Sequence, residues 1–212
     1  MTDENNDSEI QPKIKKDRQK IVVIALLCLF GAILCISGYK VATELLERRH
    51  SAETFEDLRQ SLVRPSAPVP TEKVEVDPDP ESSADIDDGN DWKKLLLESY
   101  AAVKEENPDF YGWLSVPDTV IDYPVMHTPS VPERYLRRAF DGSYSTNGVP
   151  FLDGACYEDC GNLIIYGHHM EDGTMFADLL KYADQSFWQA HPVIRFDTTE
   201  EIAEYEVLAA FY

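Results

Sequence analysis

The 212-residue sequence predicts a mainly β domain with short helices, preceded by a membrane-spanning helix and a further N-terminal helix. Three observations predict this class. Six short segments rich in β-branched and aromatic residues follow one another between residues 111 and 212. Residues 21–39 carry no charged side chain, and residues 64–91 are rich in Pro, Ser and Asp. Six strands with few helices between them favour a β-barrel or sandwich over a parallel α/β sheet.

The uncharged run at residues 21–39 predicts a transmembrane anchor, because as a helix it would be about 28 Å long, close to the thickness of a bilayer core. A buried core helix is disfavoured, since the run is apolar on every face. A cleaved signal peptide is the stronger alternative, but the run does not end in a small-x-small site. A cluster of five basic residues lies directly before the run, so we expect a single-pass protein of the cell membrane with residues 1–20 as a cytoplasmic tail.

Residues 40–90 are predicted to form an extracytoplasmic stalk and linker. Residues 41–62 contain helix formers and are expected to continue the membrane helix, whereas residues 64–91 have the composition of an extended, solvated chain. Residues 50–92 hold three bases and twelve acids and so contribute −9 to the formal net charge of −20. We interpret this charge as that of a spacer rather than an ion-binding site. The acid excess also argues against non-specific nucleic-acid binding.

The folded domain is predicted at residues 91–212. Asp91 can cap a helix that Asn107-Pro108 ends, and its apolar face would hold Leu95, Leu96, Tyr100 and Val103. The expected strands are residues 111–116, 119–126, 149–152, 162–166, 193–196 and 203–212, with helical pieces at 133–140 and 174–189. Because residues 207–212 (VLAAFY) are an apolar strand with no polar tail, we expect an interrupted, incomplete barrel.

The densest group of chemically active residues is at residues 166–176 (YGHHMEDGTMF). A strand that ends in a turn aims side chains outward, and histidine is the usual acid or base near neutral pH. Three interpretations stay open from the residues alone. The turn could be structural, it could hold zinc through His168, His169 and Asp172, or His168 could be a catalytic base paired with a nucleophile elsewhere.

A nucleophile for His168 is not evident among the four cysteines. Cys28 and Cys35 lie in the apolar run and are most simply packing residues. Cys160 is separated from His168 by the predicted strand at 162–166, which places them about 20 Å apart, and Cys156 is little better. These two cysteines form either a short-range disulfide or two free thiols.

Several motifs in order resemble class B sortases. They are residues 107–114 (NPDFYGWL), 121–126 (IDYPVM), 135–136 (YL), 148–153 (GVPFLD), 162–176 (NLIIYGHHMEDGTMF) and 191–196 (HPVIRF). The resemblance covers residues 107–212, and the anchor, stalk and leading helix fit the same layout. It implies a sortase-type β-barrel, here incomplete, and residues 91–212 as the N-terminal part of the catalytic domain.

The resemblance implies a membrane-anchored cysteine transpeptidase of Gram-positive cell walls that needs no cofactor or metal. In this family a Cys thiolate attacks the Thr carbonyl of a surface protein's sorting peptide, and an amine of the peptidoglycan cross-bridge resolves the thioester. His168 matches the catalytic acid/base, and Leu136 and Tyr166 match positions that line the substrate groove. Class B members often have Asn four residues before that Leu, where this sequence has Pro132, so the preferred sorting motif is not implied.

The family's Thr-Leu-x-Thr-Cys strand and its later Arg do not occur in the sequence. We therefore expect a C-terminally truncated sortase that does not catalyse transpeptidation alone, because loss of one member of such a unit removes most of the rate. The alternative is a non-catalytic, membrane-tethered sortase-like module or a pseudogene product. A zinc-dependent hydrolase is a more distant alternative.

Overall fold

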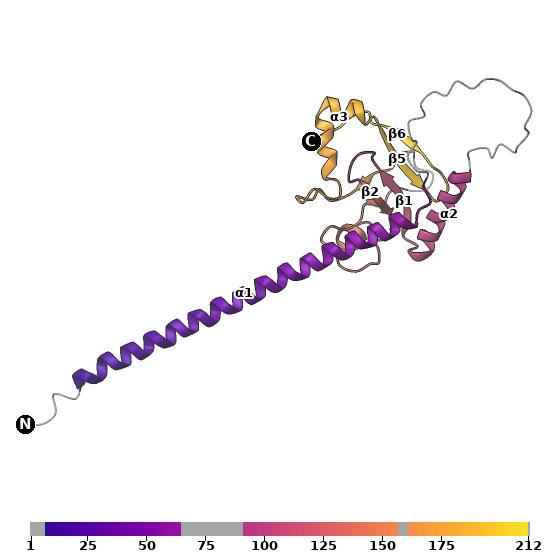
Figure 1. Ribbon diagram of the computed structural model, residues 1–212. Helices are drawn as coiled ribbons and strands as arrows, with labels where there is room; N and C mark the ends of the chain where they lie inside the picture. Colours follow the sequence, from indigo (N-terminus) through magenta and orange to yellow (C-terminus); the bar gives the residue numbers. More distant parts are fainter. Residues whose placement is uncertain (1–6, 65–90, 157–160, 212) are drawn as a thin grey trace, which may run out of the picture. The chain divides into compact units, whose positions relative to one another are not determined.

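The computed structural model describes residues 7–64, 91–156 and 161–211, with the backbone alone for residues 7–19 (Figure 1). The chain divides into two compact units, Met1–Leu46 and Glu47–Tyr212. The predicted extended linker lies almost entirely outside the described residues.

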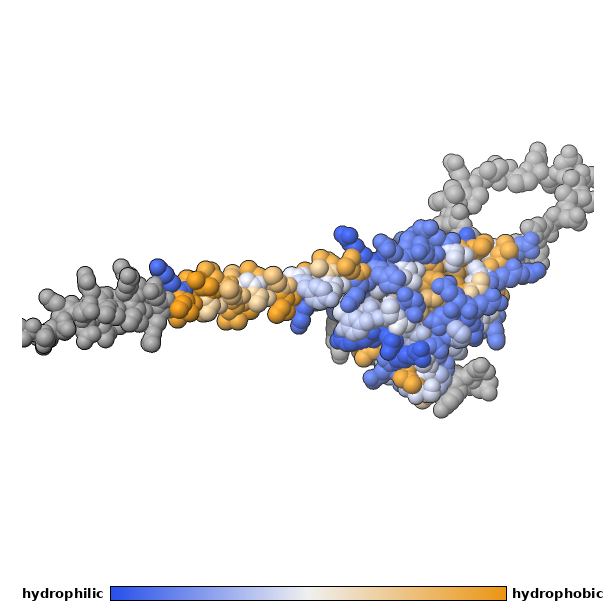
Figure 2. All heavy atoms as spheres, turned by 90° about the horizontal axis from the view of Figure 1, so that it is seen from below, coloured by the Kyte–Doolittle hydropathy of each residue, from blue (hydrophilic) through white to orange (hydrophobic). Residues whose placement is uncertain are grey.

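The first unit consists of most of helix α1 (Asp7–Ser61), which begins there and ends in the second unit. Within the described residues, one helix, Lys20–Ser61, is long and apolar enough to cross a membrane, and the side chains of its apolar window are not buried. Figure 2 shows these hydrophobic side chains gathered along the helix. The helix and its continuation through residues 41–61 are thus confirmed, and the orientation in a membrane stays a prediction.

Helix α2 (Asp91–Glu106) opens the domain as predicted and ends just before Asn107. Leu96, Tyr100 and Val103 are buried on one face because they lie four and seven residues apart. Leu95 is 46 % exposed, so its place on the apolar face was wrongly predicted. Adjacent residues of a helix point about 100° apart, so the side chain of Leu95 faces solvent while that of Leu96 is buried.

Six strands form one sheet in the described part of the chain, in the order β4-β3-β2-β1-β5-β6. Their bounds are β1 (Phe110–Ser115), β2 (Asp122–Met126), β3 (Phe151–Leu152), β4 (Ile165–Tyr166), β5 (Val193–Thr198) and β6 (Glu204–Glu206). The central strand β1 pairs with β2 and β5, and all neighbours are antiparallel except β2 and β3. Each lies within or close to a predicted segment, but β2, β3, β4 and β6 are shorter than predicted.

Short helices lie between the strands. They are the 3₁₀ helices η1 (Arg134–Arg137) and η2 (Ala177–Ala183) and the α-helix α3 (Gln185–Ala190). Both predicted helical segments are therefore confirmed, with a break at Asp184, whose side chain caps α3 through Ser186. Residues 207–211 are outside any strand, so the predicted strand at 203–212 is confirmed only at Glu204–Glu206.

The fold is mixed α/β, and the prediction of a mainly β protein is wrong in this respect. Helices α1 and α2 contain 55 and 16 residues, whereas the longest strands contain six. The physical reason is that the last turns of α1 are part of the domain: Phe55 and Leu58 are 6 % and 5 % exposed and belong to its hydrophobic core.

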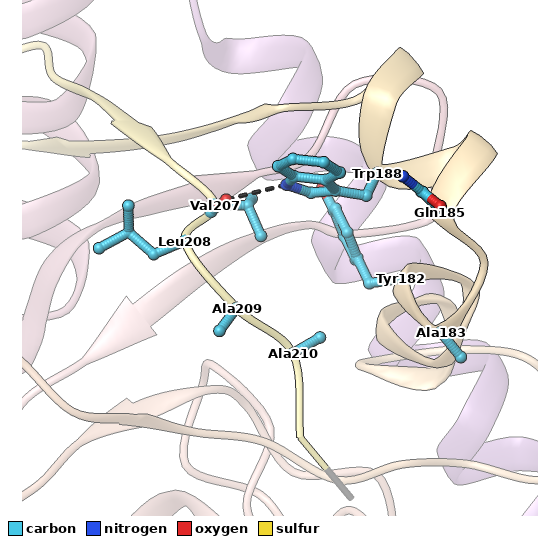
Figure 3. Close-up of a pocket in the computed structure, with 8 residues that line it drawn as sticks. All are labelled: Tyr182, Ala183, Gln185, Trp188, Val207, Leu208, Ala209 and Ala210. Atoms are coloured by element: carbon cyan, nitrogen blue, oxygen red, sulfur yellow. Dashed lines mark hydrogen bonds between the residues drawn. The ribbon is translucent and has the colours of Figure 1, made fainter.

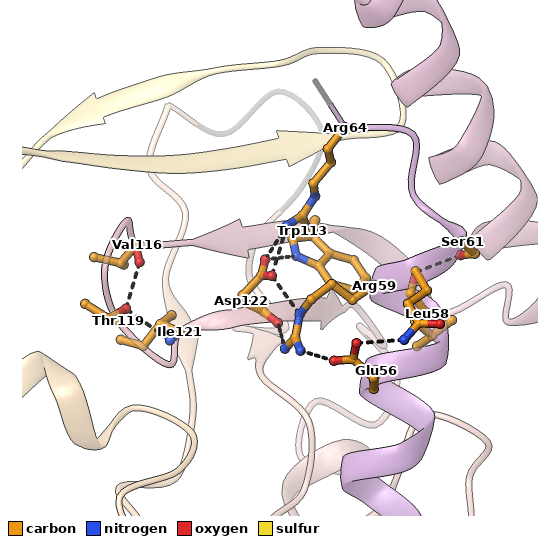
Figure 4. A network of polar contacts seen from close by, with 11 residues as sticks. Glu56, Leu58, Arg59, Ser61, Arg64, Trp113, Val116, Thr119, Ile121 and Asp122 are labelled. Carbon is orange, nitrogen blue, oxygen red and sulfur yellow. Dashed lines mark hydrogen bonds and ion pairs between the residues drawn. The ribbon is translucent and has the colours of Figure 1, made fainter. Parts of the chain in front are cut away.

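Asp122 at the start of β2 fixes the end of α1 to the sheet (Figure 4). Its carboxylate forms ion pairs with Arg59 at 2.7 Å and Arg64 at 2.9 Å, and it accepts a hydrogen bond from the Trp113 indole at 2.6 Å. The Arg64 guanidinium also lies over the Trp113 ring, 5.2 Å from its centroid. One partly buried carboxylate therefore joins α1, the segment after it and β1.

Candidate active site

His168 lies on a closed turn directly after β4. Its carbonyl accepts a hydrogen bond from the Phe176 amide at 2.9 Å, and His169 forms a bridge with Met175. Gly167 has no room for a side chain, because a Cβ there would lie 2.6 Å from the Phe176 ring. Phe176 therefore fixes the backbone around His168 in two ways: its amide binds the His168 carbonyl, and its ring packs against Gly167.

The His168 imidazole is half-buried and its environment favours the neutral form. Burial lowers the pKa of His168 below its usual value of 6.5, and the positive charge of Arg137 lowers it further, while the backbone of Asn147 acts in the opposite direction. A neutral imidazole at pH 7 can accept a proton, which is the chemistry that a general base requires.

Leu136 is on η1, next to Arg137, and its side chain is 37 % exposed. The loop that contains Asn147 lies against this helix because Gly148 adopts a φ of +63°, and a Cβ there would lie 2.5 Å from the Leu136 carbonyl oxygen. The structure thus brings η1, the Asn147 loop and the His168 turn together, and of the three predicted site residues it places Leu136 and His168 on adjoining segments.

Tyr166 precedes this turn on β4 and is 45 % exposed. Its ring contacts Phe151 across the β3–β4 pair, with centroids 5.6 Å apart, and its hydroxyl donates a hydrogen bond to Asp153 at 2.9 Å. This hydrogen bond raises the pKa of Tyr166 and helps to lower the pKa of Asp153, after the larger effect of the Ala155 amide. The phenol therefore stays protonated and fixed at the sheet edge.

Arg137, Asn147 and Asp153 were missed by the sequence interpretation. Arg137 acts on His168 through its charge and Asn147 through its backbone, and both lie far from His168 in the sequence. A signal existed for one of them: Gly148 directly follows Asn147, and a glycine before a strand indicates a backbone position that needs close approach.

The zinc interpretation of this turn has no structural support. Within the described part of the chain, no three His, Cys, Asp or Glu side chains gather closely enough to hold a metal ion. Asp172, the expected third ligand, instead accepts hydrogen bonds from Thr174 and pairs with Arg48. Cys156 is a buried free thiol whose sulfur accepts a hydrogen bond from the Ile164 amide at 3.3 Å, and Cys160 lies outside the described residues.

Two open cavities lie away from His168. One of about 330 Å³ lies between α3 and residues 207–210, where the Trp188 indole donates a hydrogen bond to the Val207 carbonyl at 2.9 Å (Figure 3). The other, of about 460 Å³, is lined by Asp109, Arg134, Tyr135 and neighbouring residues. Neither is lined by His168, Tyr166 or Leu136, so cavity size alone does not identify the site.

The comparison with curated proteins identifies the family. Sortase B of Listeria monocytogenes is 31 % identical to this chain over 211 residues, which cover 94 % of this chain and 74 % of the relative. The chain belongs to the sortase B family. Staphylococcus aureus sortase B is 26 % identical over 92 % of this chain and 70 % of its own length. A search of family models found no match.

Solved sortase B structures share this fold. The Staphylococcus aureus sortase B–substrate complex superposes with a TM-score of 0.58 at 23 % identity, and it covers 76 % of this chain and 65 % of that chain. A mutant form of Clostridium perfringens sortase B gives a TM-score of 0.57 at 22 % identity, over 73 % of this chain and 63 % of that chain. The chain thus spans slightly less than two thirds of both, and its six-stranded sheet corresponds to a sortase-like half-barrel.

A sortase B structure in complex with triglycine is 30 % identical to this chain, with a TM-score of 0.50 and a coverage of 53 % of each chain. Solved members of the family therefore include complexes with a substrate and with a short glycine peptide.

Proposed function

We propose that this sortase B family chain provides the acid/base side of the active site of a cell-wall sorting transpeptidase, with His168 as the acid/base. The observation that carries the proposal is the half-buried imidazole, whose pKa burial lowers, on a turn fixed by Gly167 and Phe176. The position of His168 in the family's Tyr-Gly-His-His context supports the same role.

The proposed reaction uses His168 as a proton carrier. Neutral His168 takes the proton of a cysteine thiol, and the thiolate attacks the Thr carbonyl carbon of a sorting peptide. The imidazolium then donates that proton to the departing amine as the peptide C–N bond breaks. The resulting thioester is attacked by an amine of the cell wall, and neutral His168 takes the proton that this amine loses as the C–S bond breaks. Leu136 and Tyr166, both exposed, would contact the sorting peptide.

The 212 residues contain no Thr-Leu-x-Thr-Cys sequence, so they supply His168 but not the family's nucleophile. We propose that this chain alone binds a sorting peptide without turning it over, because acid/base assistance without a nucleophile retains little of the rate. The second candidate is a non-catalytic, membrane-tethered sortase-like module.

Peptide binding and adduct formation test the proposal on the purified chain in detergent. Fluorescent Thr-containing sorting pentapeptides should bind, and Tyr166→Ala should weaken binding about tenfold, whereas Tyr205→Ala, an equally exposed tyrosine on β6, should leave it unchanged. Mass spectrometry with triglycine as acceptor should detect no thioester or transfer product. A thioester that persists after Cys156 and Cys160 are replaced by Ala would contradict the proposal.

Sequencing the gene beyond codon 212 separates the two candidates. A following Thr-Leu-x-Thr-Cys segment and downstream Arg would favour the enzyme, and His168→Ala in that longer protein should then abolish transfer to triglycine. A stop codon directly after Tyr212 would favour the non-catalytic module.

We also propose the membrane arrangement that the charge pattern predicts. Residues 1–20 are the cytoplasmic tail, 21–39 the anchor, 40–90 the stalk, and 91–212 the domain on the outer face of the cell membrane, as the basic residues before the span support. Protease added to intact protoplasts should digest the domain and spare an N-terminal tag. The reverse pattern would overturn this orientation.

A further inference from the structure

The last turns of α1 present one continuous face to the domain. Ser51, Phe55 and Leu58 are 2 %, 6 % and 5 % exposed, and their spacing of four and three residues places them on one side of the helix. Leu62, just after the end of α1, is 7 % exposed. Residues 47–62 are here called the positioning segment. All of them belong to the same compact unit as the His168 turn.

The positioning segment contacts the His168 turn first through an ion pair. Arg48 donates a hydrogen bond to the Asp172 carboxylate and forms an ion pair with it. The other oxygen of Asp172 accepts hydrogen bonds from the amide and hydroxyl of Thr174 at 3.1 Å and 2.6 Å. Asp172 therefore joins the positioning segment to the middle of the turn that begins at His168.

Packing between aromatic rings reinforces this contact. The ring of Phe55 meets Tyr123 edge to face, with centroids 5.2 Å apart. The Tyr123 hydroxyl in turn accepts a hydrogen bond from the Met175 amide at 3.2 Å. Met175 is buried, has a strained φ of 56°, and forms the bridge to His169. Phe55 of α1 therefore supports this residue of the turn through Tyr123.

A second contact reaches the loop on the other side of the imidazole. The Ser51 and Ser145 hydroxyls form a buried hydrogen bond of 2.9 Å, and His50 contacts Asp141 at 2.9 Å. Ser145 lies two residues before Asn147, whose backbone acts on the His168 imidazole. The positioning segment thus contacts both of the segments that enclose His168.

We infer that the positioning segment sets the orientation of His168, with Arg48 and Ser51 as positioning residues that act through Asp172 and Ser145. A role of this positioning in catalysis rests on the proposed function, whereas the contacts themselves do not depend on it. The Arg48 and Asp172 side chains are each 33 % exposed, and ion pairs at such exposure contribute little to global stability. Their removal should loosen the turn while the domain stays folded.

Histidine NMR on the full chain in detergent micelles tests this inference. The variants are Arg48→Gln, Asp172→Asn and the double variant; an asparagine at 172 can still accept the Thr174 hydrogen bonds. Arg49→Gln and Glu171→Gln are matched controls, because these neighbouring exposed residues lose the same charges. The sequence has five histidines, and His168→Gln assigns the resonance of interest. Thermal melts confirm that each variant is folded.

The signs of the pKa changes distinguish positioning from simple electrostatics. If the turn loosens, the imidazole becomes more exposed, and both single variants should raise the pKa of His168 by about 0.5 pH units, with no further rise in the double variant. A purely coulombic effect would raise it in Arg48→Gln and lower it in Asp172→Asn. Arg137 on η1 is unchanged in every variant.

Opposite shifts, no shift in either variant, or equal shifts in the controls would overturn the inference. Ser51→Ala tests the second contact independently and should also raise the pKa of His168, while Ala52→Ser, on an exposed position of the same helix, should not. None of these measurements requires sorting-peptide binding or transfer. A chain whose His168 responds but which binds no sorting peptide would therefore refute the proposed function alone.

Discussion

Replacing Gly167 by alanine should destabilise the domain and displace His168. The new Cβ would lie 2.6, 2.7 and 2.9 Å from three ring atoms of Phe176, whereas carbon atoms in favourable contact are about 3.5–4.0 Å apart. The ring must therefore move by roughly 1 Å. Because Phe176 packs against the hydrophobic core, we expect a loss of about 1–3 kcal/mol in the free energy of unfolding, as for other overpacked sites.

Urea unfolding of the detergent-solubilised chain, followed by tryptophan fluorescence, measures this loss. Gly161→Ala is the matched control, since a Cβ at Gly161 meets no atom within 4 Å. Phe176→Leu removes ring atoms that clash, so the Gly167→Ala/Phe176→Leu variant should be about 1 kcal/mol more stable than the sum of the single changes predicts. Equal stability of Gly167→Ala and Gly161→Ala, together with an unshifted His168 resonance, would refute the steric argument.

Three further predictions concern charged groups. Asp122→Ala should lower the free energy of unfolding by about 3 kcal/mol, since it leaves two guanidinium groups and the Trp113 indole without their shared carboxylate. Asp122→Asn should lower it less. Equal melting curves for Asp122→Ala and the parent chain would contradict this prediction. Burial raises the pKa of Asp141 but hydrogen bonds outweigh it and hold the pKa at about 2, below the ordinary 3.8, so its stabilising effect should be full above pH 3.8 and fade as the pH falls towards 2. Asp141→Asn should flatten that part of a pH–stability curve, and an unchanged slope there would count against it. Arg137→Gln should raise the pKa of His168 in an NMR titration by removing a nearby positive charge, and a fall would show that another effect dominates.

The elements that local sequence determines were predicted well. The six strand segments are β-branched or aromatic and bounded by turn residues, and each contains or adjoins an observed strand. Asn107-Pro108 ends α2 where predicted, because the residue before a proline disfavours helical geometry. Strand lengths were overestimated at β4 and β6, since hydrophobic pattern indicates a buried or extended segment but not whether a neighbour is present to pair with it.

The contacts that complete the candidate site were not predictable from one sequence. Arg48 and Asp172 lie 124 residues apart, and nothing in either neighbourhood indicates that they meet. The fold class was misjudged for the same reason: residues 41–62 were predicted as a helix, but their packing on the domain depends on the distant surface that receives Phe55. Asn147 acts on His168 from a loop that lies against η1 where Gly148 has a positive φ, which the sequence permits but does not require.

The position of β1 in the sheet has a consequence for how the chain folds. Its first neighbour, β2, follows it directly, so this hairpin can form as soon as both strands are synthesised. Its second neighbour is β5, where Gly112 pairs with Thr198, and this contact must wait until residue 198 has been synthesised. Closing so long a loop is slow. If the domain crosses the membrane during synthesis, the sheet must be completed on the far side, and until then β1 exposes an unpaired edge that chaperones there would need to protect.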